Sequence, residues 1–361
     1  MTLAEQQWPD FDGKEAEEFG EKLGDIINSG AIAFMISVGH KTGLFDSMAD
    51  AGPLTSAQIA ARAGLKERYV REWLAVMVTG GIVLYEPGAR LYKLPAAHAA
   101  SLTRGGALGN FAVYAQFIPM TGAIEDKLID CFKTGQGMKY EDYPCFHQVM
   151  SEDSDQTVVA NIFDLVLPLE PGLKDRLDAG IDVLDAGCGR GHALTALAER
   201  FPKNRFVGYD LCVDAIEAAC DYAADAGVEN IRFEARDLTD FDDVARFDLI
   251  TTFDAVHDQK HPADYLKRLR RALRPGGVHL MQDIGGSAHL ENNLEFPMAA
   301  FLYTASCAHC MAVSLGQGGD GLGTMWGWET AERMLKEAGY RRVERHMFEE
   351  DPMNVWFVSK A

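Results

Sequence analysis

A glycine-rich turn between a strand-like and a helix-like segment constrains this chain more than any other feature. The apolar run 181–184 stops at an acid, Asp185, and glycines follow at alternate positions before the amphipathic stretch 192–200: Gly187, Gly189 and Gly191. This order predicts a strand, a tight turn and a helix. Glycines let the backbone approach a ligand closely, and a helix N-terminus presents free N–H groups. The turn therefore predicts a site for a small polar molecule, with an ordinary glycine-rich βα turn as the alternative.

Acids also mark the ends of the next two predicted strands. The strand 205–210 ends in Asp210, which is placed to accept both hydroxyls of a ribose, as in nucleotide-binding βαβ units. A predicted helix, 215–226, leads to the strand 231–235 and then to Asp237, whose carboxylate could accept a bond from an adenine amino group. Acids at three successive strand ends would then contact three parts of one adenosine-type ligand.

The motifs DAGCGRG, GYD and ARDL, with the stretches 247–250 and 273–278, resemble those of class I S-adenosylmethionine-dependent methyltransferases over about the last half of the chain. A GxGxG turn after an acid disfavours a nicotinamide cofactor. The resemblance implies S-adenosylmethionine as cofactor and S-adenosylhomocysteine as product, with Asp185 on the ammonium, Asp210 on the ribose and Asp237 near the adenine. The cofactor-binding residues predicted on this basis are Asp185, Gly187, Gly189, Gly191, Asp210, Leu211, Asp237, Leu238, Phe253 and Asp254.

Composition narrows the class of protein. The 361 residues suffice for two domains, and the net charge of −20 disfavours nucleic acid and anionic membranes as partners. No apolar run approaches the roughly 20 residues of a membrane span, and the first twenty residues lack a signal-peptide pattern, so we expect a cytoplasmic protein. The seven cysteines are scattered, and the single CxxC pair, Cys307 and Cys310, has no second pair to complete a zinc site. We therefore predict no metal.

The first part of the chain has the element order of a winged helix. An apolar segment at helical spacing, 31–49, precedes a capped short helix, 54–64, a longer helix, 66–79, and a hairpin, 82–94. This layout resembles that of small-molecule O-methyltransferases, in which the winged-helix domain serves dimerisation and closes the partner's active site. The resemblance implies a homodimer.

DNA binding is the alternative for a winged helix. The predicted recognition helix carries Lys66, Arg68 and Arg71, but Glu67 and Glu72 partly offset them. Because phosphate contacts supply most non-specific affinity, a strongly acidic chain starts at a disadvantage. We therefore expect no nucleic-acid partner.

A candidate general base follows the fourth predicted strand, 247–252. His257 lies in the loop after this strand, at the sheet edge where ligands bind in open α/β folds, and its pKa near neutrality suits proton abstraction from a hydroxyl. The string 256–258 is similar to that of plant and bacterial O-methyltransferases, in which a histidine-aspartate pair provides the general base. Those enzymes usually continue with a tryptophan, whereas this chain has Gln259. A surface-loop histidine is the alternative reading. Asp254 is a candidate to contact the cofactor or to orient the base.

Two less regular segments are expected to form the substrate cavity. In two-domain methyltransferases a segment like 96–180 links the domains and roofs the cofactor, which makes Tyr140, Phe146 and His147 candidates for the cavity wall, although such aromatics are more often simply core. The apolar run 296–311 contains His309, an alternative base or substrate-orienting group. The glycine-rich loop 316–328, with Trp326, is predicted to be a mobile lid over a broad apolar pocket.

The motifs HCMAVSL and GGDGLGTMWG are similar to those of a largely uncharacterised methyltransferase group of mycobacteria and animals. A final helix, 329–338, and the hairpin 341–348 with 354–359 complete the sheet. We therefore predict a doubly wound, seven-stranded Rossmann-like methyltransferase sheet preceded by a mostly helical winged-helix-like domain. The predicted parts are a dimerisation domain, 1–95, a helical linker and active-site cover, 96–180, and the S-adenosylmethionine-binding domain, 181–361.

The predicted function is methyl transfer to a small, mainly apolar or aromatic metabolite at a hydroxyl oxygen, with His257 as base. N- or S-methylation without a required base is an alternative, since amines and thiols are better nucleophiles. A non-catalytic cofactor-binding or DNA-associated regulator is the second alternative.

Overall fold

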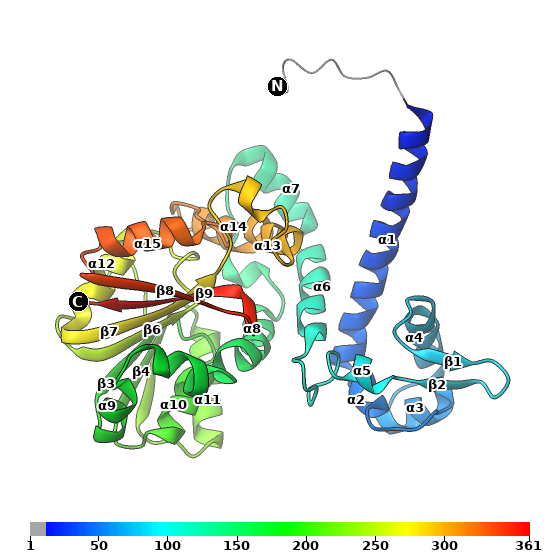
Figure 1. Cartoon of the computed structure of the whole chain (residues 1–361), viewed down its shortest axis with the longest axis horizontal. Helices are drawn as coiled ribbons and strands as arrows, with labels where there is room; N and C mark the ends of the chain where they lie inside the picture. Colours follow the sequence, from blue (N-terminus) through cyan, green and yellow to red (C-terminus); the bar gives the residue numbers. More distant parts are fainter. Residues whose placement is uncertain (1–11) are drawn as a thin grey trace. The chain divides into compact units, whose positions relative to one another are not determined.

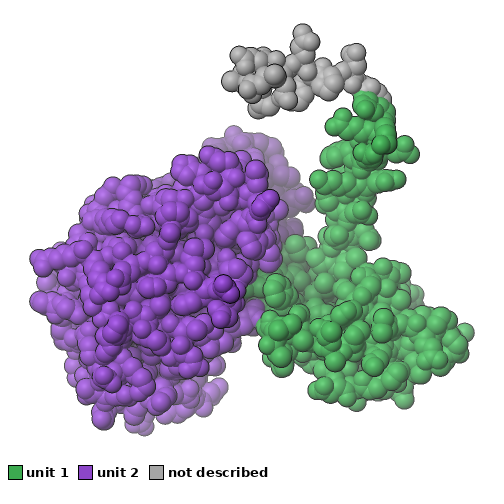
Figure 2. Space-filling model, in the orientation of Figure 1, with its two compact units in different colours: residues 1–119 green, residues 120–361 purple. Residues whose placement is uncertain are grey.

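The chain divides into two compact units, residues 1–119 and residues 120–361 (Figure 2). The computed structural model describes residues 12–361, so the first eleven residues of the predicted domain 1–95 lie outside the described residues. The boundary between the units falls inside the segment 96–180. The predicted three-part division stays a prediction.

The first unit has the helix order and hairpin of a winged helix. Thr55 forms a capping box at the start of α3, and Gly64, with φ of +68°, ends that helix, as the sequence predicts. The elements are α1 Gly13–Lys41, α2 Leu44–Met48, α3 Ser56–Ala63, α4 Glu67–Thr79, β1 Leu84–Glu86, β2 Leu91–Lys93, α5 Ala96–Ala99 and η2 Phe111–Gln116. Helix α6, Phe117–Gly122, spans the unit boundary.

Helix α1 is longer than the sequence predicts. It begins at Gly13, where the side chain of Asp12 caps it, instead of near residue 31. Its C-terminal half packs on α4, and the indole of Trp73 donates to the carbonyl of Met35 at 2.9 Å. Its first half is exposed. The apolar residues of that half recur at helical spacing but cover no core of their own unit: Phe19, Leu23, Ile26 and Ile27.

Short helical segments precede the sheet in the second unit. They are α7 Glu125–Thr134, η3 Tyr140–Asp142, α8 Phe146–Ser154, η4 Asp155–Val159, η5 Ile162–Val166, η6 Leu167–Leu169 and α9 Leu173–Ala179. Two of them, η4 and η5, are π-helical turns with a break between them.

Seven strands form one sheet in the order β5-β4-β3-β6-β7-β9-β8. The first five are mutually parallel, and β9 runs antiparallel to β7 and β8. The strands are β3 Asp182–Ala186, β4 Arg205–Asp210, β5 Ile231–Ala235, β6 Phe247–Phe253, β7 Leu273–Ile284, β8 Arg342–Phe348 and β9 Asp351–Lys360, and the helices between them include α10 His192–Arg200, α11 Val213–Asp225, α12 Pro262–Ala272 and α15 Trp328–Glu337. This confirms the predicted fold class.

Helices cover both faces of the sheet, with α9 and α10 on one side and α12 and α15 on the other (Figure 1). Neighbouring strand residues point to opposite cores: Val183 packs with the first pair of helices and Leu184 with the second. Strand β3 lies between β4 and β6, where the chain reverses its direction across the sheet. Ligands of such sheets bind at the carboxyl ends of the strands at this point.

A broken apolar helix lies between the sheet strands β7 and β8 in sequence. It consists of α13 Ala299–Ala305, the π-turn η8 Ser306–Cys310 and α14 Met311–Gly316, and the short η7 Leu290–Asn293 precedes it. Within residues 12–361, the run 299–316 is the one helix whose length and composition would allow it to cross a membrane, and 39% of it is buried. Core helices of soluble proteins can be equally long and apolar, so this run is weak evidence for a membrane span.

The glycine-rich loop after this helix is packed against its surroundings. A Cβ at Gly319 would collide with the carbonyl of Lys260, and one at Gly327 with the backbone of Ala288. Gly316 likewise lies against the backbone of Met138, whose amide donates to Ala312 at 2.8 Å. These glycines permit close contact between backbones.

Candidate active site

The glycine turn after β3 is fixed to the neighbouring strand. The amides of Gly187 and Cys188 both donate to the carbonyl of Tyr209, at 2.8 and 3.0 Å. A Cβ at Gly187 would lie 2.5 Å from that of Ala255, and one at Gly191 would lie 2.6 Å from the ring of Phe233. At Gly189 a Cβ would meet nothing within 4 Å. The predicted glycines thus divide into two that packing requires and one that faces open space.

Asp210 links this turn to the end of β4. Its two carboxylate oxygens accept from the amides of Gly189 and Cys212, at 2.8 and 2.9 Å. Burial raises its pKa, although these two hydrogen bonds favour the ionised form. Leu211, the next predicted residue, is exposed beside it.

Asp185 is buried near the end of β3, where it accepts a hydrogen bond of 2.8 Å from the hydroxyl of Thr251. Burial raises the pKa of its carboxyl to about 7. At the end of β5, Asp237 is exposed and accepts from the amide of Thr239, and Leu238 is buried.

Phe253 and Asp254 follow at the end of β6. The backbone of Asp254 has a φ of +48°, a conformation that costs energy in a residue other than glycine. One of its oxygens, Oδ2, accepts from the side-chain amide of Gln282 at 2.9 Å, and the other has no partner among residues 12–361. Burial and the nearby Asp283 raise its pKa to about 8.

His257 is buried rather than on the surface, which excludes the surface-loop reading. Its Nδ1 lies 2.7 Å from Oδ1 of Asp283, the penultimate residue of β7. Burial alone would lower the pKa of His257, but the carboxylates of Asp283 and Asp258 raise it well above its usual value. Asp283 is not among the site residues predicted from the sequence. The available signal was its place at the end of the strand-like stretch 278–283, because an acid there lies at the same sheet edge as Asp185 and Asp210.

Trp326, which the sequence placed in the substrate pocket, contacts the same carboxylate. Its indole donates to Oδ1 of Asp283 at 3.0 Å, and the backbone amide of Ile284 donates to the same oxygen at 2.8 Å. Trp326 therefore helps to hold the partner of His257.

His309 lies in the π-turn η8 within a cluster of aromatic rings. The ring of Phe146 stacks on it with centroids 3.8 Å apart, and Tyr143 and Tyr140 approach it edge-on at 4.6 and 5.6 Å. Its Nδ1 lies 3.9 Å from Oδ2 of Asp258. Burial lowers the pKa of His309 to about 4, so its ring is neutral.

A cavity of about 590 Å³ opens beside Asp210 and has the size of a small-molecule site. Its wall includes four residues predicted to contact substrate or cofactor: Tyr140, Phe146, His147 and Leu211. The full lining consists of Lys139, Tyr140, Glu141, Tyr143, Cys145, Phe146, His147, Gln148, Arg190, Leu211, Cys212, Asp214 and Ala218.

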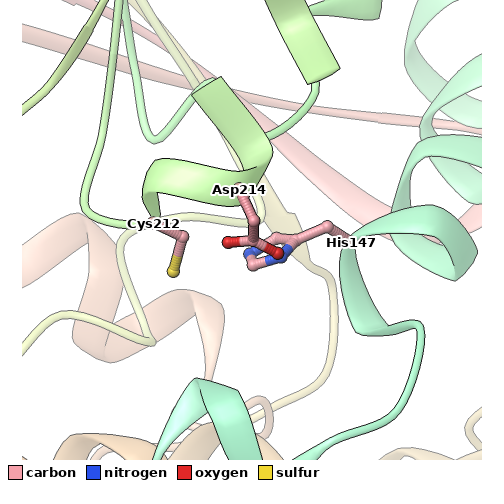
Figure 3. A group of neighbouring side chains, drawn as sticks. All are labelled: His147, Cys212 and Asp214. Atoms are coloured by element: carbon pink, nitrogen blue, oxygen red, sulfur yellow. The ribbon is translucent and has the colours of Figure 1, made fainter. Parts of the chain in front are cut away.

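Three side chains on this wall have donor atoms close enough to hold a metal ion: His147, Cys212 and Asp214 (Figure 3). Nδ1 of His147 lies 3.4 Å from Oδ2 of Asp214. Burial, with Asp210 and Asp214, raises the pKa of the Cys212 thiol to about 12, which disfavours the thiolate that binds metals. Cys212 and Asp214 also begin α11, and a helix N-terminus repels cations. Two further groups, His257–Asp258–Cys310 and Asp254–His257–Asp283, share the histidine that Asp283 already holds.

Two parts of the chain match two different protein families. Residues 30–104 match the family described as the Rv2258c-like winged HTH domain, and residues 177–339 match the family described as a methyltransferase domain. Among curated proteins, a methyltransferase of Aspergillus campestris, ungE', is 24% identical over 359 residues, which cover 93% of this chain and 95% of that protein.

Solved structures share the fold over most of the chain. A candidate O-methyltransferase of Nostoc punctiforme aligns with a TM-score of 0.71 at 18% identity, over 94% of this chain and 98% of that one. Human N-acetylserotonin methyltransferase, solved in complex with S-adenosylmethionine, aligns with a TM-score of 0.67 at 17% identity, over 98% and 99% of the two chains. At these identities the likeness concerns the fold.

Proposed function

This chain is a methyltransferase with an N-terminal winged-helix domain, and we propose that it transfers the methyl group of S-adenosylmethionine to a hydroxyl oxygen of a small, mainly apolar or aromatic metabolite. S-adenosylhomocysteine is the second product. The observation that carries the proposal is the buried pair of His257 and Asp283 at the sheet edge that holds the glycine turn.

The electrostatics of the strand ends fit a cationic donor. Asp185 and Asp254 are carboxyls whose pKa burial raises, and an ammonium or sulfonium beside them would offset the cost of burying their charge. Asp254 also has one oxygen without a partner among residues 12–361. The open space at Gly189 would let a ligand approach the turn. Asp210, Asp237 and Leu238 would surround the ribose and the adenine.

His257 supplies the base that a hydroxyl acceptor needs. With Nδ1–H donated to Asp283, Nε2 is left to take a proton. The acceptor oxygen forms a bond to the methyl carbon, the bond from carbon to sulfur breaks with its electron pair left on sulfur, and the hydroxyl proton moves to Nε2. A base positioned in this way contributes about 10²- to 10⁴-fold to the rate.

Methyl transfer from labelled S-adenosylmethionine to a panel of phenols, carboxylates, amines and thiols tests the proposal. We expect labelled methyl ethers from hydroxylated aromatics, and strong loss of that activity in His257→Ala. His261→Ala is the matched control, because His261 lies four residues away and is exposed beside Asp320. Products from amines or thiols alone, or full turnover by His257→Ala, would contradict the proposal.

We further propose that the chain forms a homodimer through α1. Large apolar side chains are exposed along much of this helix, including Phe19, Ile27 and Phe34. Isolated apolar residues on a surface are ordinary, but a row of them on one protruding helix indicates a protein partner. The cytoplasmic location expected from the sequence stays a prediction.

A further inference from the structure

The imidazole of His309 is buried, and neither of its ring nitrogens has a hydrogen-bond partner among residues 12–361. A buried polar group without a partner costs roughly 1–3 kcal/mol, so proteins seldom keep one without a function. Because the ring is neutral, one nitrogen is a donor and the other an acceptor. His309 therefore offers both kinds of hydrogen bond to whatever fills the space beside it.

The surrounding rings hold His309 in place. Phe146 stacks on one face at an angle of 16°, and Tyr143 packs against its edge. The hydroxyl of Tyr143 donates to the carbonyl of Ala308 at 2.6 Å, so it is engaged elsewhere. The imidazole is positioned by packing alone.

Asp258 lies between His309 and His257. Its Oδ1 is 3.3 Å from Nε2 of His257, without the geometry of a hydrogen bond, and its Oδ2 is 3.9 Å from Nδ1 of His309. Nε2 of His257, which is expected to take the proton, thus faces one carboxylate oxygen of Asp258, and Nδ1 of His309 faces the other. Tyr140 and Phe146, whose rings lie against that of His309, also line the cavity of about 590 Å³.

We propose that His309 and Asp258 form a second polar subsite, which selects an aromatic acceptor with an oxygen ortho to the hydroxyl that is methylated. This rests on the proposed O-methylation. His309 donates a hydrogen bond to the ortho oxygen, and Asp258 accepts a hydrogen bond from that oxygen when it is a hydroxyl. Phe146 and Tyr140 provide the apolar surface for the ring.

Turnover of catechol, 2-methoxyphenol and phenol by the full chain tests the subsite. We expect kcat/KM for catechol to exceed that for phenol at least about tenfold, because phenol leaves His309 without a partner. The methoxy oxygen can only accept, so 2-methoxyphenol should fall between them. In His309→Leu the ratio of kcat/KM for catechol to kcat/KM for phenol should fall toward one, because leucine offers neither a donor nor an acceptor to the ortho oxygen. His309→Gln, which keeps a donor and an acceptor, should retain part of the preference.

Cys307→Ser is the matched control on the same π-turn and should keep the full preference. Titration of catechol and phenol into the complex of wild-type enzyme with S-adenosylhomocysteine needs neither turnover nor a variant, and should show the same order of affinity. Equal binding of catechol and phenol, or a preference that survives in a folded His309→Leu protein, would overturn the inference. Preferential binding of catechol without methylation of any hydroxyl would instead overturn the proposed function and leave the subsite supported.

Discussion

Nδ1 of His257 lies 2.7 Å from Oδ1 of Asp283, and both side chains are buried. The same oxygen accepts from Trp326 and from the amide of Ile284, so the carboxylate cannot turn away without breaking three hydrogen bonds. This fixes the tautomer of the neutral imidazole and directs Nε2 toward Asp258, whose Oδ1 lies 3.3 Å away. Asp283 is a positioning residue for the proposed base.

Asp283→Asn should lower kcat by about 10²- to 10⁴-fold, because the amide has nearly the same shape but no charge to hold the imidazole and to stabilise its protonated form. The pKa of His257 should fall at the same time. The pH profile of kcat measures both effects. Asp320→Asn, which alters the exposed partner of His261, serves as control and should leave the profile unchanged. An unchanged kcat in Asp283→Asn would exclude the positioning role.

Activity should rise with pH through a pKa above the usual value for histidine. His257 is a base only when it is deprotonated, and the carboxylates of Asp283 and Asp258 raise its pKa. Stability should follow the opposite trend. The contribution from this raised pKa is fully present below the unfolded-state value and is lost as pH rises through the folded-state value. Profiles of kcat and of thermal unfolding test both trends, and activity that peaks below neutral pH would contradict the first.

Binding of S-adenosylmethionine should release protons at neutral pH. The pKa values of Asp185 and Asp254 are raised to about 7 and about 8, so both carboxyls are partly protonated near neutrality. A cationic ligand favours their ionised forms, so affinity should increase as pH rises through this range. Calorimetry in buffers of different ionisation enthalpy counts the protons. Asp254→Asn should release fewer of them, and binding without any release would refute the assignment.

Ile27→Asp should convert the proposed homodimer into a monomer, because Ile27 is 68% exposed on α1 and a charge there would have to be buried in the interface. Light scattering measures the mass in solution. Tyr69→Asp is the control, since Tyr69 is equally prominent at 81% exposure but lies on α4. A monomeric wild-type protein at micromolar concentration would remove the basis for the proposal.

Local patterns were enough to predict the sheet and the glycine turn. The bounds of α10, β4 and β5 agree with the prediction to the residue. Strand β4 is a mostly apolar run that ends at an acid, and the edge strand β5 alternates apolar and charged residues. The placement of His257 at the carboxyl edge followed from the same pattern, although its burial did not.

What the sequence could not show depends on contacts between distant segments. Asp283 meets His257 only because β6 pairs with β7, and the rings around His309 come from a segment some 165 residues away. The amide of Met138 binds the carbonyl of Ala312, and this contact brings the two segments together. Such contacts leave no periodic signal. The glycines that permit them were therefore interpreted as a mobile loop.

The three glycines of the turn should respond differently to alanine, because their surroundings differ. Gly187→Ala and Gly191→Ala place a methyl group against Ala255 and the ring of Phe233, so both should lower the melting temperature. Gly189→Ala should cost only about 1–2 kcal/mol, the penalty of positive φ, since its Cβ meets nothing within 4 Å. If that open space belongs to the methyl donor, Gly189→Ala should nonetheless weaken donor binding beyond what its stability loss explains. Thermal melts and donor titrations of the three variants separate the effects, and unaltered affinity in Gly189→Ala would place the donor elsewhere.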